Sequence, residues 1–335
     1  MNLIESKVTP LPYNYRSVYE HIEKCGRTCY HSLDQIKTES AHPFVDRLIN
    51  SQHYAMLEHA SFAFEVDSDL YSYLKAKNEL MKYESQKGIY EPPCWGVQSL
   101  NFSHVHVSTG DRFIVSGNVR ALNNARCYPI YVVMSYMGIP TYVVPDDFFN
   151  FQYDKCVFIK NVWNVPELTV EEISAHIYYT YYIVTDRGVT HEFVRHRKMS
   201  FAQESTRYCN YSKDKFGGEI TFIKPHDYNN WPQPMKTLFE FSMTRSERDY
   251  MDILEAGATP QQARAVLPNA VKASLIASAN VQEWIHFFNV RYRGLTGAPH
   301  PDMKEVAEKI HREYYSSMMM GLMHCGLRQE ADFML

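Results

Sequence analysis

The spacing of apolar residues predicts two amphipathic helices and a strand near the start of the chain. In segments 18–25 and 44–49 the apolar positions recur three and four residues apart, so each set falls on one helical face. Apolar and polar residues alternate over 61–66, a pattern typical of a half-buried strand. The first part of the chain is therefore expected to mix helices with short strands.

The middle of the chain gives a weaker pattern. Short β-branched runs predict strands at 103–107 and 112–118, the second leading into a helix at about 120–124. The aromatic and β-branched run at 178–184 predicts another strand. That strand is expected to lead into a helix that carries the basic residues 195–197.

The last third is predicted to be helical. Thr259 is a candidate N-cap for a helix over 260–267, which Pro268 would stop. A long helix is expected over about 270–290, and a last one over about 302–323. Because no linker interrupts the chain, residues 1–335 are expected to form a single α+β domain. That domain would combine an antiparallel sheet, flanking helices and a long C-terminal helical part.

The composition narrows the class of protein. A hydrophobic content of 45% and a charged content of 21% are ordinary for a packed globular chain. The net charge of −4 argues against broad binding to nucleic acid or to an anionic membrane. Seven cysteines without a compact spacing, and an N-terminus without a signal pattern, favour a soluble cytoplasmic protein with reduced thiols.

Segment 195–208 gathers cations, hydroxyls and amide or carboxyl side chains in one short span. Such groups need partners when they are buried, so they are expected on a surface or around a polar ligand. Arginine suits phosphate, and amides suit the edge of a base. The segment therefore favours a site for a phosphorylated, nucleotide-like ligand, and the alternative is a solvated basic turn between two helices.

A longer motif extends from the basic triplet at 195–197. The triplet is followed by matching residues at Ser200, Ser205, Arg207 and Tyr208, and preceded by the lead-in 190–194. This pattern resembles the signature of the flavin-dependent thymidylate synthases, the ThyX family. The resemblance implies a ThyX-like fold and reductive methylation of dUMP to dTMP. Methylenetetrahydrofolate would supply the carbon, FAD reduced by NADPH would supply the hydride, and a homotetramer would share each flavin between subunits.

The resemblance also implies site residues. Segment 27–29 resembles one family element, and segment 53–59 resembles another, although Ala55 lacks the usual hydroxyl. Gln282 replaces the usual arginine in segment 280–291, which removes a charge near the flavin. The implied FAD contacts are Cys29, His53, Ala55, Arg195, His196, Arg197, Lys198, Gln203, Asn280, Gln282 and His286.

The implied dUMP contacts overlap with these. They are Glu192, Arg195, Gln203, Ser205, Arg207, Arg264 and Arg291. Arg291 takes the catalytic position, where a cation stabilises negative charge that develops on the uracil ring. Ser205 is not expected to be a covalent nucleophile, because no triad is evident beside it.

The resemblance covers about 25–65 and most of 180–310. Segment 67–175 is an insertion that compact family members lack. It could enlarge the folate side of the site, alter contacts between subunits or be inert, and the sequence does not decide between these roles.

Three alternatives come from other classes of function. Cys94, in the segment 92–95, could be a nucleophile, as in the unrelated thymidylate synthases, but Trp95 stands where their histidine is found. The basic motif could bind RNA or DNA. The last alternative is a zinc site, for which the candidate ligands are Cys25, Cys29, His31, His104 and His106. The favoured interpretation includes no metal, no nucleic acid and no membrane.

Overall fold

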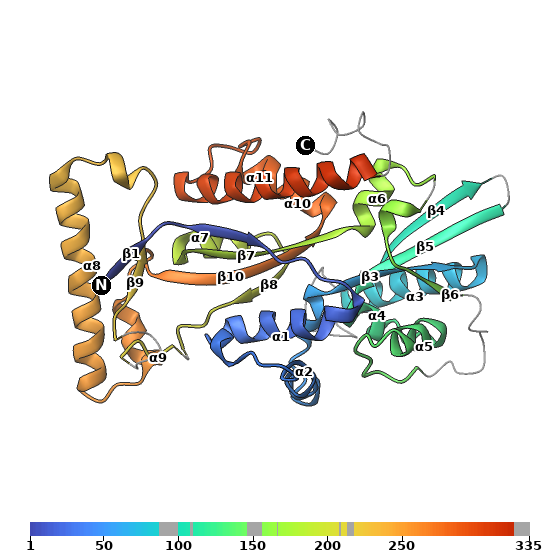
Figure 1. Cartoon of the computed structure of the whole chain (residues 1–335), viewed down its shortest axis with the longest axis horizontal. Helices are drawn as coiled ribbons and strands as arrows, with labels where there is room; N and C mark the ends of the chain where they lie inside the picture. The colour runs from blue at the N-terminus through green and yellow to red at the C-terminus, as the bar shows by residue number, and fades with distance from the viewer. Residues whose placement is uncertain are drawn as a thin grey trace.

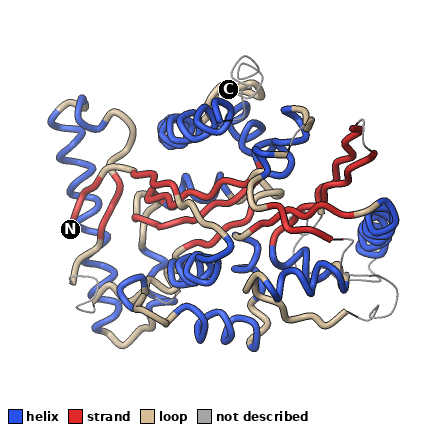
Figure 2. Tube along the Cα trace, turned by 45° about the vertical axis from the view of Figure 1, so that its right-hand side comes forward, coloured by secondary structure: helices blue, strands red, loops and turns tan. Residues whose placement is uncertain are grey.

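The computed structural model describes residues 1–86, 100–107, 110–145, 156–165, 167–207, 209–212 and 218–324. Over these residues the chain forms two four-stranded antiparallel sheets and one parallel pair of short strands (Figure 1). Helices lie on both sides of the strands (Figure 2). A mixed fold with antiparallel sheets, as the sequence predicted, is therefore confirmed.

The first sheet has the order β2 (Lys7–Pro10), β7 (Tyr178–Asp186), β10 (Lys272–Asn280) and β8 (Ser200–Gln203). Side chains alternate between its faces: Ile276 packs toward helix α1 (Val18–Cys29), whereas Leu275 and Ala277 join the core on the opposite side. That opposite side is covered by α7 (Arg187–Phe193), α10 (Val281–Arg291) and α11 (Pro301–His324). The sheet thus lies between two hydrophobic layers.

Most of the second sheet comes from segment 67–175. Its order is β4 (Asn101–Val107), β5 (Gly110–Asn118), β3 (Ser61–Val66) and β6 (Cys156–Ile159), with β3 alone lying outside segment 67–175. The α-helices in the described part of the segment are α3 (Ser68–Gln86), α4 (Val119–Asn124), α5 (Tyr128–Tyr136) and α6 (Val170–His176), which ends one residue beyond it. Each of the two main hydrophobic cores contains residues from both sheets. Segment 67–175 is therefore part of the packed core.

A smaller core lies beside the first sheet. The parallel strands β1 (Asn2–Ile4) and β9 (Thr221–Ile223) pack with the long helix α8 (Gln233–Glu255) and the short α9 (Pro260–Ala263). Helix α2 (Ala41–Asn50) packs against α1. The 3-10 helices are Tyr15–Ser17, Leu33–Gln35, Tyr54–His59, Val162–Asn164, Tyr228–Asn230 and Arg264–Val266.

The predicted long helix over 270–290 is wrong. Residues 272–280 form the central strand β10, and only Val281–Arg291 is helical. The alanines of this strand favour a helix by propensity. The segment forms a strand instead, because β7 and β8 pair with its two edges and because the side chains on both of its faces are buried. The basic triplet at 195–197 also follows α7 and does not lie within it.

In the described residues, no helix combines the length and the apolar character that crossing a membrane requires.

Because four histidines are buried, we expect the folded protein to lose stability on mild acidification. Burial lowers the pKa of His59 to about 3 and the pKa of His21, His176 and His196 to about 4. Between these values and the unfolded value of 6.5, the unfolded chain binds more protons than the folded one. The free energy of unfolding should therefore fall as the pH falls through this window, by about 1 kcal/mol per pH unit for each such histidine.

Urea unfolding between pH 7 and pH 4 measures this slope. Replacing His176, which lies between the hydroxyls of Ser103 and Ser116, by glutamine should reduce the slope. The same replacement at the exposed His42 should leave it unchanged. An equal slope in all three proteins would contradict the assignment of neutral buried histidines.

Candidate active site

Arg291, at the end of α10, is fixed by residues of the basic motif and its lead-in. Its Nη1 donates to Glu192 Oε2 at 2.5 Å, its Nη2 to the Glu192 carbonyl at 3.3 Å, and its Nε to His196 Nε2 at 3.0 Å. The arginine side chain is half-buried. A planar guanidinium with partners on three nitrogens has one orientation, so the position of its charge is defined.

His196 is neutral in this arrangement. Burial lowers its pKa to about 4, and the charge of Arg291 and the nearby His286 add to the effect. Since Nε2 accepts the hydrogen bond from Arg291, the proton of the neutral ring is on Nδ1. The ring packs edge-on against Phe287. His196 therefore orients Arg291 without adding a second positive charge.

Exposed cations surround this arginine and histidine. Arg195, Arg197 and Lys198 all lie on the surface, and Lys198 reaches Glu283 of α10 at 3.0 Å. Side chains that are exposed in this way are available to a ligand with a negative charge, so this surface suits a phosphate group.

The predicted flavin residues of α10 lie at its N-terminal half. Asn280 is the N-cap, and its side chain accepts the N–H of Glu283 at 3.0 Å. Gln282 donates to the carbonyl of Glu171 of α6 at 3.3 Å. His286 is exposed one turn further on. Asn280 and Gln282 thus already have protein partners, whereas the His286 ring faces solvent and His196.

A second group of predicted residues meets at the end of β8. The N–H of Ser205 donates to the carbonyl of Cys29 at 3.1 Å, and the Cys29 Sγ lies 3.9 Å from Met56 Sδ. Arg264 donates to the hydroxyl of Thr206 at 3.2 Å. His53 and Ala55 lie half-buried at the start of the 3-10 helix that contains Met56. The exposed Arg207 follows in the chain.

Gln203 connects the motif with the helix before it. Its side chain donates to the hydroxyl of Thr190 on α7 at 2.8 Å. Because residues alternate along β8, the next side chain, Glu204, points to the opposite face of the sheet, toward α1. Most of the predicted site residues therefore form two groups, one around Arg291 and one around Ser205. Gln203 lies beside the Arg291 group.

A buried ion pair that no motif indicated supports the second group. Arg120 of α4 donates to Glu58 at 2.6 Å, and both side chains are almost fully buried. Glu58 lies in the segment 53–59 and also lies near the Ser200 hydroxyl. Only the fold shows this pairing, because 62 residues separate the two partners.

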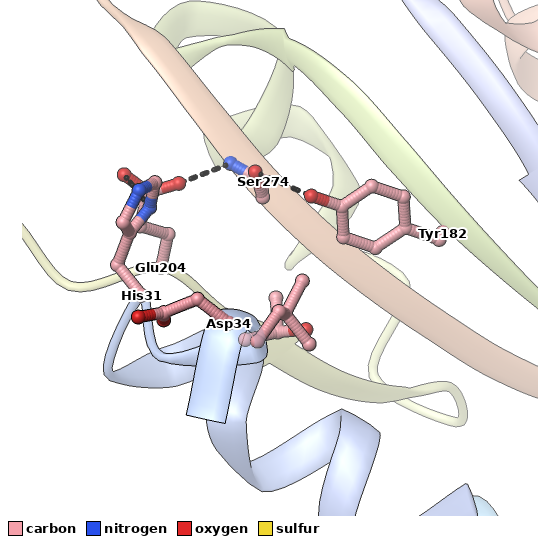
Figure 3. A pocket seen from close by; sticks show the side chains of 7 residues that line it. His31, Asp34, Tyr182, Glu204 and Ser274 are labelled. Carbon is pink, nitrogen blue, oxygen red and sulfur yellow. Dashed lines mark hydrogen bonds and ion pairs between the residues drawn. The ribbon is translucent and has the colours of Figure 1, made fainter. Parts of the chain in front are cut away.

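A pocket of about 170 Å³ opens on the α1 face of the first sheet (Figure 3). The Tyr182 hydroxyl donates to Ser274 there, and the backbone N–H of Ser274 donates to Glu204. The lining residues are Thr28, His31, Leu33, Asp34, Tyr182, Glu204 and Ser274.

The predicted zinc set is not assembled in the described part of the chain. Cys25 is buried beside His21, whereas His104 and His106 both pair with Asp111 on the distant β4–β5 hairpin. His31 instead faces Glu204. The described cysteines form no disulfide, and Cys94 lies outside the described residues.

Comparison with known proteins supports the resemblance seen in the motif. Residues 153–318, just under half of the chain, match the family described as thymidylate synthase complementing protein. The flavin-dependent thymidylate synthase of Geobacter sulfurreducens is 30% identical over 139 residues, which cover 41% of this chain and 56% of that protein. The enzyme of the same name from Pyrococcus furiosus is 31% identical over 151 residues, with coverages of 43% and 57%.

The matched region thus spans little more than half the length of these relatives. Among solved structures, a UMP/dUMP methylase, PolB, from Streptomyces cacaoi, bound with 5-Br dUMP, shares 22% identity at a TM-score of 0.35. That similarity covers 43% of this chain and 69% of the other.

Proposed function

Because residues 153–318 of this chain match the thymidylate synthase complementing family, we propose that the protein is a flavin-dependent thymidylate synthase. The proposed reaction is the reductive methylation of dUMP to dTMP. The carbon donor is methylenetetrahydrofolate, and NADPH is the reductant.

One observation supports this proposal above the others. Arg291 forms a single hydrogen-bonded group with Glu192 and His196, which lie 99 and 95 residues before it in the chain. The family motif implies a role for each of the three. A solvated basic turn between helices would not require such a group, since its cations would find partners in water.

The residues of the site fit a phosphorylated flavin cofactor. Arg195, Arg197 and Lys198 offer exposed donors for a diphosphate, and His286 offers an exposed ring beside His196. Asn280 and Gln282 would hold the flavin from α10, and Cys29, His53 and Ala55 from the other group. When bound, FAD supplies the hydride, and the protein supplies binding and electrostatics.

Nucleotide recognition is proposed to use both groups. Arg195, Ser205, Arg207 and Arg264 would hold the phosphate, sugar and base of dUMP. Glu192 and Gln203 would lie between nucleotide and flavin. Arg291 would stabilise the negative charge that develops on uracil. Glu192 fixes the direction of that guanidinium. Because His196 is neutral, it does not compensate the guanidinium charge on the side where it accepts the hydrogen bond.

A homotetramer completes the proposal, in a soluble, cytoplasmic enzyme. Among the described residues of one chain, the Arg291 group and the Ser205 group form separate clusters. The family resemblance implies that subunits share each flavin, so groups from different chains would form one site. Sedimentation of the full chain with and without FAD tests this arrangement.

Release of tritium from dUMP labelled at C5 tests the activity. The release should require NADPH, FAD and methylenetetrahydrofolate, and equal amounts of dTMP should form. Product formation without added or bound flavin would contradict the proposal.

Because Gln282 stands where the family usually has an arginine, we expect weak flavin binding, and one substitution should strengthen it. Replacing it with arginine restores the charge expected near the cofactor, and a charge-assisted hydrogen bond exceeds a neutral one by about 1 kcal/mol. The Kd for FAD should fall about fivefold, as measured by flavin fluorescence. The variant Gln282→Met controls for side-chain length. Equal affinity of the arginine and methionine variants would show that this position does not contact the flavin.

A further inference from the structure

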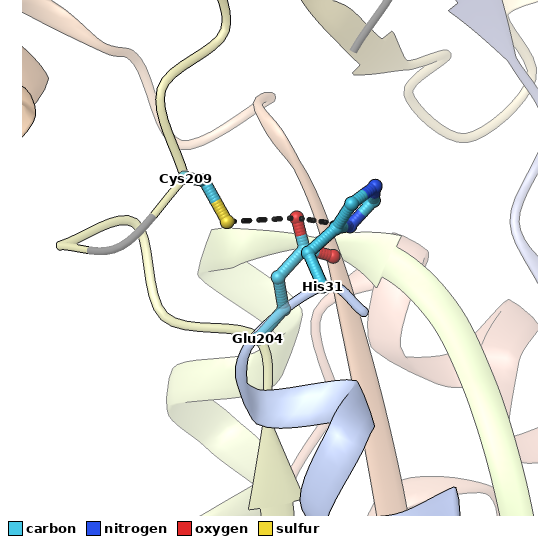
Figure 4. Close-up of side chains that lie close together, drawn as sticks. All are labelled: His31, Glu204 and Cys209. Carbon is cyan, nitrogen blue, oxygen red and sulfur yellow. Dashed lines mark hydrogen bonds and ion pairs between the residues drawn. The ribbon is translucent and has the colours of Figure 1, made fainter. Parts of the chain in front are cut away.

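Three potential metal ligands converge beneath the pocket on the α1 face. His31 follows α1 in a left-handed backbone conformation, with φ of 48°. Glu204 directly follows β8, and Cys209 lies five residues further along. Figure 4 shows their side chains pointing toward one another, and their ligand atoms all lie within 4.8 Å of one another.

The two distances from Glu204 Oε1 to the other ligand atoms match those of a tetrahedral metal centre. His31 Nδ1 lies 3.3 Å from Glu204 Oε1, and Cys209 Sγ lies 3.6 Å from the same oxygen. Zinc bonds of about 2.0 Å to oxygen and nitrogen and about 2.3 Å to sulfur, at tetrahedral angles, place O and N about 3.3 Å apart and O and S about 3.5 Å apart. We propose that His31, Glu204 and Cys209 bind a divalent metal ion of the zinc class.

The carboxylate of Glu204 is prepared for this role. Its Oε2 accepts from Lys272 Nζ at 2.6 Å and from the Ser274 N–H at 3.2 Å, so Oε1 is the oxygen that faces His31 and Cys209. Lys272 and the Ser274 N–H thus hold the carboxylate in one orientation, and Lys272 would be an outer partner of the metal.

The pocket provides access for the ion. His31 and Glu204 line it, while Cys209 is fully buried behind them. A nitrogen, an oxygen and a sulfur ligand suit zinc or cobalt better than magnesium or calcium, which prefer oxygen. Water from the pocket would fill the fourth position, as in zinc sites with three protein ligands.

A metal here would connect the end of α1 with the segment that carries Ser205 and Arg207. The ligands Glu204 and Cys209 stand on either side of those two residues in the chain. Bound metal would thus hold the segment in place. This inference does not depend on the proposed function, since metal binding is measured without substrate.

Cobalt titration of the chelator-treated full chain, produced without a histidine tag, tests the site. One Co²⁺ should bind per chain and give visible bands of a tetrahedral centre together with a thiolate-to-cobalt charge-transfer band in the near ultraviolet. Zinc added in equal amount should remove these bands. Cobalt binding without the charge-transfer band, or no binding, would overturn the proposal.

Variants assign the ligands. Cys209→Ser should abolish the charge-transfer band, while Cys25→Ser, at an equally buried cysteine, should retain it. His31→Ala alters a half-exposed side chain and should fold; its cobalt affinity should fall more than about 100-fold, beyond the effect of losing an outer partner. Unchanged affinity in His31→Ala would refute the site even if Cys209→Ser fails to fold.

Discussion

Replacing Arg291 with lysine is expected to lower kcat/KM for dUMP by about 100-fold or more. Removing one donor that stabilises a developing negative charge costs about 100-fold to 1,000-fold in kcat. Lysine keeps the charge but has no planar fork to contact both Glu192 and His196. The charge would therefore lose its fixed position.

The pattern of the kinetic change identifies the role. If Arg291 acts on the developing charge, kcat and kcat/KM fall together, whereas loss of simple substrate binding raises KM alone. Arg293→Lys is the matched control, because Arg293 lies two residues away and is exposed, with a hydrogen bond to Asn289. Wild-type kcat in Arg291→Lys would refute the catalytic role.

Replacing Arg120 with methionine is expected to destabilise the protein by about 3–5 kcal/mol. The substitution leaves the carboxylate of Glu58 buried without its ion-pair partner, and removing one member of a buried pair costs about that much. Urea unfolding at neutral pH measures the loss of free energy. Arg112→Met is the matched control, since Arg112 and Glu65 form a half-exposed pair, and solvent-exposed pairs contribute about 1 kcal/mol or less.

A second substitution separates the cause. Adding Glu58→Gln to Arg120→Met removes the uncompensated charge, so the double variant should be more stable than Arg120→Met alone. If Arg120→Met and Arg112→Met unfold at the same urea concentration, the buried pair contributes no more to the free energy of unfolding than the Arg112 pair does. A loss of stability would also show that the insertion supports segment 53–59.

Local signals predicted the parts of the fold that depend on neighbouring residues. Helix α1 and strand β3 follow from their apolar spacing, and both formed as expected. Strand β10 differs from the predicted helix. Ala273, Ala277 and Ala279 favour a helix locally, but the strand pairs with β7 and β8, whose residues lie about 70 to 100 positions away.

The same limit applies to the site. Residue types indicated a ligand site at 195–208, whereas only the family resemblance implied a role for Arg291. The fold brings Arg291 into contact with His196 of that segment. Nothing in the sequence indicated that Glu204 faces α1 while Gln203 faces α7, because this depends on the alternation along β8 and on the pairing of that strand. The partners of Glu58 and Glu204 became evident only in the fold.

The absorbance spectrum of the purified protein under anaerobic conditions tests the central claim most directly. NADPH should bleach a bound-flavin spectrum, and dUMP should accelerate the bleaching, because flavin, reductant and nucleotide then act at one site. A colourless protein that neither binds added FAD nor oxidises NADPH would contradict the assignment as a flavin-dependent thymidylate synthase.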